Sequence, residues 1–510
     1  WINADGGLIT DTSNWFPIIP FVAPGPGPDD PVTYGPDAAY TVRFNSSAAA
    51  HVIHDRATVY QGDVTFDLNR LTIDPFDPPL ATGSFQPAPP LGGLLSGAVY
   101  ELDKSDGTSF RITTADGNDT RVTIRSGEVR TRDARVDSDL HDAQARLTVG
   151  SGGRLNTQGR PLDIASVWNG SMRVENGGQL DTGVLTMSEN WYHIPYSNGS
   201  LTVTGLDSAW NGTAAYLGGS ATQSGSDARL SITSQGRATV AGTVKLWDDA
   251  HIHLSSGGTL DVGAFDDQGG TLFWSTGTLR IRNQVSRIDA GELLGQHLVI
   301  GNDKFFDHRR PLVVGANPVP DQNGHASLIV RDNGNVRIGS GASADHVTLG
   351  LAGSAEGSLD ITGALTTWLG NVHVGGSDDY LGGIGHLIVT QGATPQGNLE
   401  IALNAEAAGD VLLPNPGTLW TAGRAVIGRY GSGAAANASL NIESGAALHV
   451  RELFAATNSG AVASIDLAGE GSHLLVDGNN VAAQLGGYGA VEIDVVDGAA
   501  LTMVDAPTIL

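Results

Sequence analysis

A short strand-like pattern recurs along most of the chain: a small or polar residue, an apolar residue, any residue, and then Val, Ile or Leu. Ten copies show a common spacing, and most neighbouring ones among them are 25 to 31 residues apart. Longer gaps of 98 and 53 residues are close to four and two of these periods. Repeats of this length become stable by stacking on one another. The first apolar residues of the ten copies are Leu147, Met172, Leu201, Leu230, Leu328, Leu359, Leu387, Leu440, Ile465 and Val491.

Two further strand-like segments follow each copy. A Gly-containing turn introduces the second, as in Gly152-Gly153-Arg154-Leu155, and the third often ends in an apolar-Gly step such as Leu217-Gly218. Short strands of this kind, each paired with its equivalent about 4.8 Å away in the next coil, form a β-solenoid. The sequence therefore predicts an all-β, parallel β-solenoid (β-helix) of roughly 15 or more coils over residues 101–510. The leucines at 147, 201, 230, 359 and 440, with the isoleucine at 465, are expected inside.

Composition excludes several other classes. The 510 residues include 70 Gly and no Cys, so disulfide frameworks and Cys-based metal sites are ruled out. The sequence contains no run of about 20 apolar residues, so it predicts no membrane-spanning helix. The net charge of −26 repels nucleic acid and anionic membranes. We expect no nucleic-acid partner and no direct membrane insertion.

Four repeats share a longer phrase, in which a segment ending in Trp leads to an apolar-Gly step. It occurs at Gly205–Trp210, Gly363–Trp368 and Pro416–Trp420, and at Gly469–Leu474 with Leu in place of Trp. The phrase resembles the autotransporter-associated and PEP-CTERM-associated repeat of large bacterial surface and exported proteins, over roughly residues 140–510. The resemblance implies a right-handed β-helix, secreted or displayed on a bacterial cell surface, and it does not imply an enzyme.

Trp210, Trp368 and Trp420 recur at one place in this phrase, where Leu474 substitutes in register. A ladder of sugar-stacking rings is one interpretation. The substitution by Leu favours a buried core aromatic instead.

Residues 1–100 differ from the rest because most of the proline lies there, in 17–36 and 75–90. The first coil of a solenoid has an unpaired strand edge that promotes aggregation, and Pro-rich segments can cover such an edge. We interpret residues 1–100 as an N-terminal Pro-rich cap with the initial strands.

Candidate chemistry is sparse, and we predict no catalytic residue and no cofactor. The adjacent pairs Asp248-Asp249, Asp266-Asp267 and Asp378-Asp379 would point to opposite faces of a strand, which favours turn and solvent roles. His251 and His253 would share one strand face, the best metal candidate in the chain. No third ligand can be named, so the sequence leaves metal binding open.

Linkers of variable length precede several of the repeats. Since they occupy one position in the repeat, they should emerge from one corner of the solenoid, where loops commonly carry recognition. Their aromatic residues suit glycans or partner proteins. The predicted ligand-binding residues are Trp191, Tyr192, Tyr196, Tyr380 and Tyr430. A separate segment, Asn302–Arg310, is predicted to form a local lid.

The leading hypothesis is a non-enzymatic extracellular structural or adhesive surface protein. The alternatives are a polysaccharide-degrading β-helix enzyme, either a lyase or a glycoside hydrolase, and a phage-type receptor-binding spike. Two carboxylates within about 10 Å in a groove across adjacent coils would favour the enzyme. The apolar residues 500–510 further predict end-to-end self-association, which would propagate into a fibre.

Overall fold

The structure is a computed structural model, in which every described element is a β-strand. No helix of the described residues is long and apolar enough to cross a membrane. Before residue 110, only the side chains of Val42, Val64 and Phe66 are described. The described residues are 7–8, 31–34, 39–43, 51–54, 56–59, 62–67, 99–102, 110–113, 119–125, 127–138, 143–150, 152–189, 197–301, 303–316, 325–339, 345–376, 382–429, 436–478, 483–504 and 508–509.

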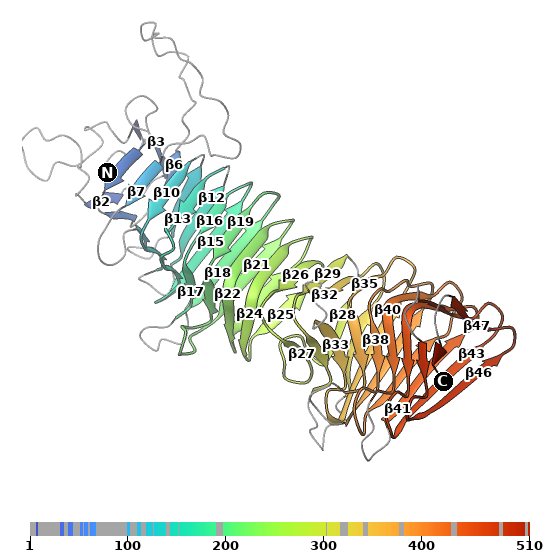
Figure 1. The fold of residues 1–510 in the computed structure, drawn as a ribbon. Helices are drawn as coiled ribbons and strands as arrows, with labels where there is room; N and C mark the ends of the chain where they lie inside the picture. Colours follow the sequence, from blue (N-terminus) through green and yellow to red (C-terminus); the bar gives the residue numbers. More distant parts are fainter. Residues whose placement is uncertain are drawn as a thin grey trace, which may run out of the picture. The chain divides into compact units, whose positions relative to one another are not determined.

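The chain divides into two compact units, Trp1–Trp274 and Ser275–Leu510, and each unit is a parallel β-solenoid. Within each unit, strands pair in parallel with their equivalents one coil away, as the repeating arrows of Figure 1 show. The predicted all-β, parallel β-solenoid is confirmed. One sheet of unit 1 has ten strands, seven of them after residue 100, and one sheet of unit 2 has eight, which roughly agrees with the coil number expected for residues 101–510.

The ten-stranded sheet of unit 1 is called the first sheet below. Its strands are β1 (Gly7–Leu8), β3 (Ala39–Arg43), β6 (Gly62–Asp67), β9 (Thr120–Arg125), β12 (Ala145–Gly150), β15 (Asn169–Glu175), β18 (Asn198–Thr204), β21 (Ala228–Thr233), β23 (Ala250–Leu254) and β25 (Thr271–Trp274). The other strands of unit 1 form the second and third strand lines of each coil, and β22 and β24 each run through both lines. They are β2 (Pro31–Tyr34), β4 (His51–His54), β5 (Arg56–Val59), β7 (Val99–Leu102), β8 (Phe110–Ile112), β10 (Glu128–Thr131), β11 (Ala134–Val136), β13 (Arg154–Asn156), β14 (Leu162–Ile164), β16 (Gln179–Asp181), β17 (Val184–Met187), β19 (Ala209–Gly212), β20 (Ala214–Leu217), β22 (Arg237–Trp247) and β24 (Thr259–Gln268).

Unit 2 repeats this arrangement around its own eight-stranded sheet. That sheet contains β28 (His297–Ile300), β31 (His325–Val330), β34 (Gly353–Thr362), β37 (Gly382–Thr390), β39 (Ala408–Leu413), β41 (Ala436–Glu443), β43 (Ala461–Ala468) and β46 (Ala490–Val496). The remaining strands are β26 (Gly277–Ile281), β27 (Ser286–Ile288), β29 (Lys304–His308), β30 (Leu312–Val314), β32 (Asn335–Ile338), β33 (His346–Leu349), β35 (Thr367–Leu369), β36 (Asn371–Val374), β38 (Leu399–Ile401), β40 (Leu419–Ile427), β42 (Ala447–Ala455), β44 (His473–Asp477), β45 (Ala483–Leu485), β47 (Ala500–Val504) and β48 (Thr508–Ile509).

The core lies where the sequence pattern predicts it. Leu147, Met172, Leu201 and Leu230 are register partners on four successive strands. All four are buried, as are the predicted core residues of unit 2, because every second residue of each strand points inward. Full burial of one such side chain contributes about 1.5–3 kcal/mol, and the stack repeats that gain in every coil.

The apolar-Gly step at the end of the third strand has a conformational cause. Leu217, Leu349, Val374, Ile427 and Leu485 each end a strand. The Gly that follows each of them has a φ between 67° and 80°. Side chains other than Gly rarely adopt this left-handed conformation, so Gly allows the chain to leave the strand and turn.

Two details differ from the sequence-based expectation. Ile465 pairs with Ile493 rather than with Val491, so the last repeat is two residues longer than predicted. The segment Asn302–Arg310 is not a lid, because β29 runs through it and Phe306 is fully buried. Before residue 100, where initial strands were expected, β1 pairs with β3 and β3 with β6. The Pro-rich stretch 75–90 lies outside the described residues, so the capping role and the boundary at residue 100 stay predictions.

Candidate functional site

Two neighbouring rows of outward side chains on strands β9 to β25 of the first sheet are called the arginine face below; a further outward row beside them contains Glu175 and Thr204. The first row crosses seven strands as Arg121, Arg146, Ser171, Ser200, Arg229, His251 and Thr271. The second row runs beside it as Thr123, Thr148, Arg173, Thr202, Ser231, His253 and Phe273. These fourteen positions hold four Arg, two His, seven Ser or Thr and one Phe, and no carboxylate.

Three guanidinium groups are held in place from the margin of the face. Asp119 lies between two of them, 3.3 Å from Nη2 of Arg146 and 3.8 Å from Nη2 of Arg121. Nε and Nη2 of Arg146 also donate to Oε1 of Gln144, at 3.0 and 2.6 Å. Arg173 pairs through Nε with Glu175 on its own strand. Each guanidinium has five N–H donors, and these contacts use only some of them.

A shallow pocket of about 420 Å³ opens on this face. It is lined by Arg121, Thr123, Arg146, Leu147, Thr148, Ser171, Met172, Arg173, Ser200 and Thr202. The side chains of the three arginines remain 41–52% exposed, so solvent or a ligand can reach them. The pocket therefore offers several cationic donors together with a row of hydroxyl groups.

The corresponding outward rows of unit 2 have the opposite charge. One row reads His297, Ser327, Ser358, His386, Asp410, Ser439, Ser464 and Glu492. The other reads Val299, Ile329, Asp360, Ile388, Leu412, Asn441, Asp466 and Asp494. These sixteen positions hold five carboxylates and no Arg. The arginine face is thus specific to unit 1 and is not a general property of the repeat.

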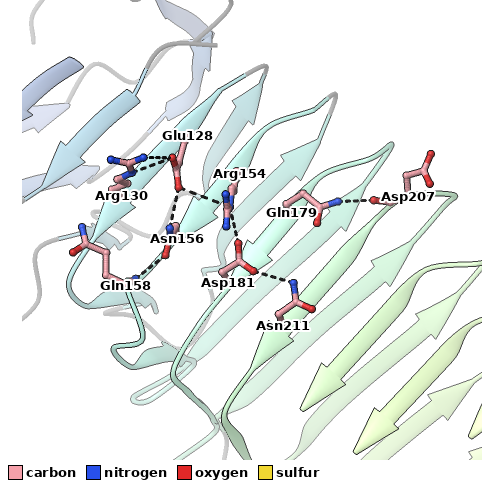
Figure 2. Close-up of polar contacts among 9 residues, drawn as sticks. All are labelled: Glu128, Arg130, Arg154, Asn156, Gln158, Gln179, Asp181, Asp207 and Asn211. Carbon is pink, nitrogen blue, oxygen red and sulfur yellow. Dashed lines mark hydrogen bonds and ion pairs between the residues drawn. The ribbon is translucent and has the colours of Figure 1, made fainter. Parts of the chain in front are cut away.

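A second polar cluster in unit 1 lies on the neighbouring strand line, where β10, β13, β16 and β19 stack (Figure 2). Nε of Arg154 lies 2.6 Å from Oδ2 of Asp181 and 3.8 Å from Oε1 of Glu128. Glu128 also accepts hydrogen bonds from Arg130 and Asn156, at 3.0 and 2.9 Å. The cluster is a ladder of ion pairs and hydrogen bonds that joins one coil to the next.

The two carboxylates of this ladder, Glu128 and Asp181, are as close together as a catalytic pair, but their environment does not suit acid–base catalysis. Through the shared nitrogen of Arg154, the oxygens of Glu128 and Asp181 are no more than 6.4 Å apart. Burial alone would raise the pKa of Glu128, but hydrogen bonds from Asn156 and Arg130 and the charges of Arg130 and Arg154 outweigh it, so this pKa lies below its ordinary value. Glycoside hydrolysis needs a protonated carboxyl group beside its partner. Neither carboxylate lines the pocket on the arginine face.

The two candidate metal ligands belong to the arginine face. His251 and His253 both point outward from β23, as predicted, and both contact the ring of Phe273. The ring centroids of His253 and Phe273 are 4.7 Å apart in a stacked arrangement. Among the described residues, no group of three or more His, Cys, Asp or Glu side chains is arranged to hold a metal ion.

The recurring tryptophans lie in the core, as predicted. Trp210, Trp368 and Trp420 are at most 1% exposed. Each indole Nε1 donates one hydrogen bond, to Thr182 Oγ1 at 3.0 Å, to the carbonyl oxygen of Gly370 at 3.0 Å and to that of Gly397 at 2.8 Å, respectively. Rings in this position cannot stack on a sugar.

The predicted ligand-binding aromatics lie outside the described residues. Trp191, Tyr192 and Tyr196 fall in residues 190–196, Tyr380 in 377–381 and Tyr430 in 430–435. In each case the flanking strands are described. They are the third strand of one coil and the first strand of the next, so the linker joins these two. The linkers therefore share one position in the repeat, and ligand binding by their aromatic residues stays a prediction.

The arginine face was not predicted, because the apolar residues that define the repeat give no sign of it. The outward residues stand between them, as Arg146 and Thr148 stand on either side of Leu147. Aligning these intervening positions across the repeats would have revealed the rows. The three pairs of adjacent aspartates do not converge: Asp248-Asp249 lies in a turn, Asp266-Asp267 lies on β24, and Asp378-Asp379 lies outside the described residues.

Comparison of the chain with protein-family models, with curated proteins and with solved structures finds no match.

Proposed function

We propose that the chain is an extracellular structural or adhesive surface protein that binds through its faces and edges and does not cleave a substrate. One observation carries the proposal: the pocket on the arginine face has no carboxylate in its lining. The nearby pair of carboxylates in unit 1 is neutralised by arginine. The resemblance to exported bacterial repeats supports a location outside the cell.

Recognition at the linker corner is part of this proposal. Exposed aromatic side chains bind glycans and proteins well because they offer a large rigid surface. Replacing Trp191 and Tyr192 by Ala should weaken binding to a glycan or cell surface and leave the melting temperature nearly unchanged. Loss of stability with unchanged binding would assign these residues to packing instead.

End-to-end association is the second part of the proposal. The strand β46 is the last of the eight-stranded sheet, and its core-facing Val491 and Ile493 are partly exposed, whereas Ile465 in the preceding coil is fully buried. Val495 is 43% exposed. A strand edge with an open apolar core can pair with a strand of a second copy. Because such a contact is heterologous, repetition of it would give a filament.

Light scattering of the full chain over a range of concentrations, with electron microscopy of the same samples, tests the assembly. Concentration-dependent growth into rods supports it. Replacing Val491 and Val495 by Lys should abolish growth, because charges on an edge strand oppose pairing. A mass that stays monomeric at every concentration would overturn the assembly. A compact particle of three copies would instead support the spike.

A further inference from the structure

We infer that the arginine face of unit 1 binds an extended acidic polysaccharide, with its anionic groups on Arg121, Arg146 and Arg173 and its sugar hydroxyls on the serines and threonines between them. This inference names a ligand for the proposed surface protein and therefore rests on that function. The site is separate from the aromatic linkers.

The charge of the arginine face is opposite to that of the whole chain. The chain carries 54 acidic and 28 basic residues, of which three are Lys and 25 are Arg, or about 5% of all residues. Four of the fourteen positions of the arginine face are Arg, and none is Asp or Glu. The matching rows of unit 2 contain five carboxylates and no Arg. A cationic strip on a strongly acidic protein attracts anions selectively to that strip.

The guanidinium groups of the arginine face are arranged to bind anionic groups. Arg121 and Arg146 are register partners on adjacent strands, where like charges repel. Among the side chains that the structure describes, one carboxylate, that of Asp119, lies near both guanidinium groups. The Nη1 atoms of both residues, and both Nη atoms of Arg173, donate no hydrogen bond to a described residue. Guanidinium groups bind carboxylates and sulfates well because two parallel N–H donors match two oxygens.

The length of the arginine face suits a polymer better than a small anion. Arg121 and Arg229 are four strands apart, about 19 Å at the usual strand spacing. One small anion cannot contact both ends, whereas a chain with repeated acidic groups can. Ser171, Ser200 and Thr202 lie between the arginines and supply both donors and acceptors. These hydroxyls suit the hydroxyl-rich stretches between the acidic groups of a polysaccharide.

The far end of the face offers a stacking surface. Phe273 is 50% exposed and is the last member of the second row. The stacked ring of His253 holds it in place. An exposed ring of this kind can pack against the apolar face of a sugar. Arginine, hydroxyl and aromatic groups therefore follow one another along a single track.

Isothermal titration calorimetry of the full chain tests the inference with four probes: polygalacturonate, dextran sulfate, neutral dextran and single-stranded DNA. We expect binding of one or both acidic polysaccharides and no binding of dextran. The polygalacturonate and dextran sulfate arms separate a carboxylate ligand from a sulfate ligand. Raising the salt concentration should weaken binding, because exposed charges are screened.

The variant R121S/R146S/R173S should lose at least about tenfold in affinity, since each guanidinium lost removes charge-assisted hydrogen bonds. The matched control R331S/R337S/R451S removes the same charge from exposed positions of unit 2 and should bind like the wild type. Replacing the same three arginines of the face by Lys keeps the charge and should give an intermediate affinity.

Three results would overturn the inference: no binding of either acidic polysaccharide, equal losses in the arginine-face variant and its control, or DNA binding as tight as polysaccharide binding. If the Ser variant of the arginine face loses binding and its circular dichroism spectrum also changes, the Lys variant decides. The inference then requires that the Lys variant folds and binds. None of these results bears on end-to-end assembly, which the scattering experiment tests separately.

Discussion

Trp420 on β40 and Leu448 on β42 are direct register partners, and both are fully buried. The same line continues through Leu474 and then Leu501. One core position therefore accepts an indole ring in one coil and a leucine in the next three. The solenoid tolerates this change of volume because each coil packs mainly against its two neighbours.

Replacing Trp420 by Ala should lower the free energy of unfolding by about 3–5 kcal/mol, because a large cavity opens in the core. Replacing it by Leu should cost only about 1–2 kcal/mol, since neighbouring coils already hold Leu there. Urea unfolding of both variants measures the difference. As a control, Leu206, which is 66% exposed, can be changed to Ala at a cost within about 0.5 kcal/mol. Equal costs for the Ala and Leu variants at Trp420 would contradict this account.

Two adjacent glycines should differ in their sensitivity to alanine. A Cβ atom on Gly178 would lie 2.1 Å from the carbonyl oxygen of Val149 in the preceding coil, so G178A should cost about 3 kcal/mol or more. Gly177 has open space around it but a φ of 79°, so G177A should cost only about 1–2 kcal/mol. Thermal unfolding of the two variants decides, and the reverse order would show that the coils can separate locally at little cost.

Asp163 should make unit 1 less stable as the pH rises. Burial raises the pKa of Asp163 to about 6, and the Glu189 carboxylate acts in the same direction. Between the ordinary pKa of 3.8 and this value, the folded state holds a proton that the unfolded state has lost, so stability falls with rising pH. D163N should therefore be more stable than the wild type by about 2–3 kcal/mol at pH 8, with almost no difference below pH 4. A difference that is constant across pH would contradict the assignment.

Two histidines should make unit 2 sensitive to acid. Burial lowers the pKa of His373 to about 3, helped by the charges of His346 and Arg429, and burial lowers that of His308 to about 4. Below the ordinary pKa of 6.5, the unfolded state gains protons that the folded state does not bind, so stability falls as the pH falls. H373Q should reduce this slope by about 1.4 kcal/mol per pH unit between pH 6 and pH 4. Denaturant unfolding across that range measures the slope, and an unchanged slope would exclude His373 as its cause.

The sequence was sufficient to predict the coil and its inward residues, because apolar residues that become buried alternate with polar residues that stay exposed along each strand. The length of the 98-residue gap, close to four periods, also indicated that further coils lie within it. There β23 and β25 carry Ile252 and Leu272 as the register equivalents of Leu230, and Ile252 lies in a further copy of the pattern, His251-Ile252-His253-Leu254. The final repeat was misplaced because Val491 and Ile493 fit the pattern equally well, and only pairing with Ile465 distinguishes them.

The candidate site was harder to predict because it depends on neighbours across coils. Arg121, Arg146 and Arg173 are separated by 25 and 27 residues and form a site only when three strands lie side by side. The segment around Phe306 was misread for a similar reason. Its charged residues suggested a surface loop, whereas pairing of β29 with β26 and β32 places the ring in the core.

The register of the first sheet also has a genetic consequence. Met172 and Leu201 are equivalent residues one coil apart, and so are Ser171 and Ser200. Loss of the 29 residues from Met172 to Ser200 would join Ser171 to Leu201 and restore the same sequence pattern at the junction. Whole coils can thus be gained or lost by unequal recombination with the hydrophobic interior kept intact. Each such event would shift the spacing between Arg146 and Arg229 by one strand, about 4.8 Å, so the ligand-binding track could change length in fixed steps during evolution.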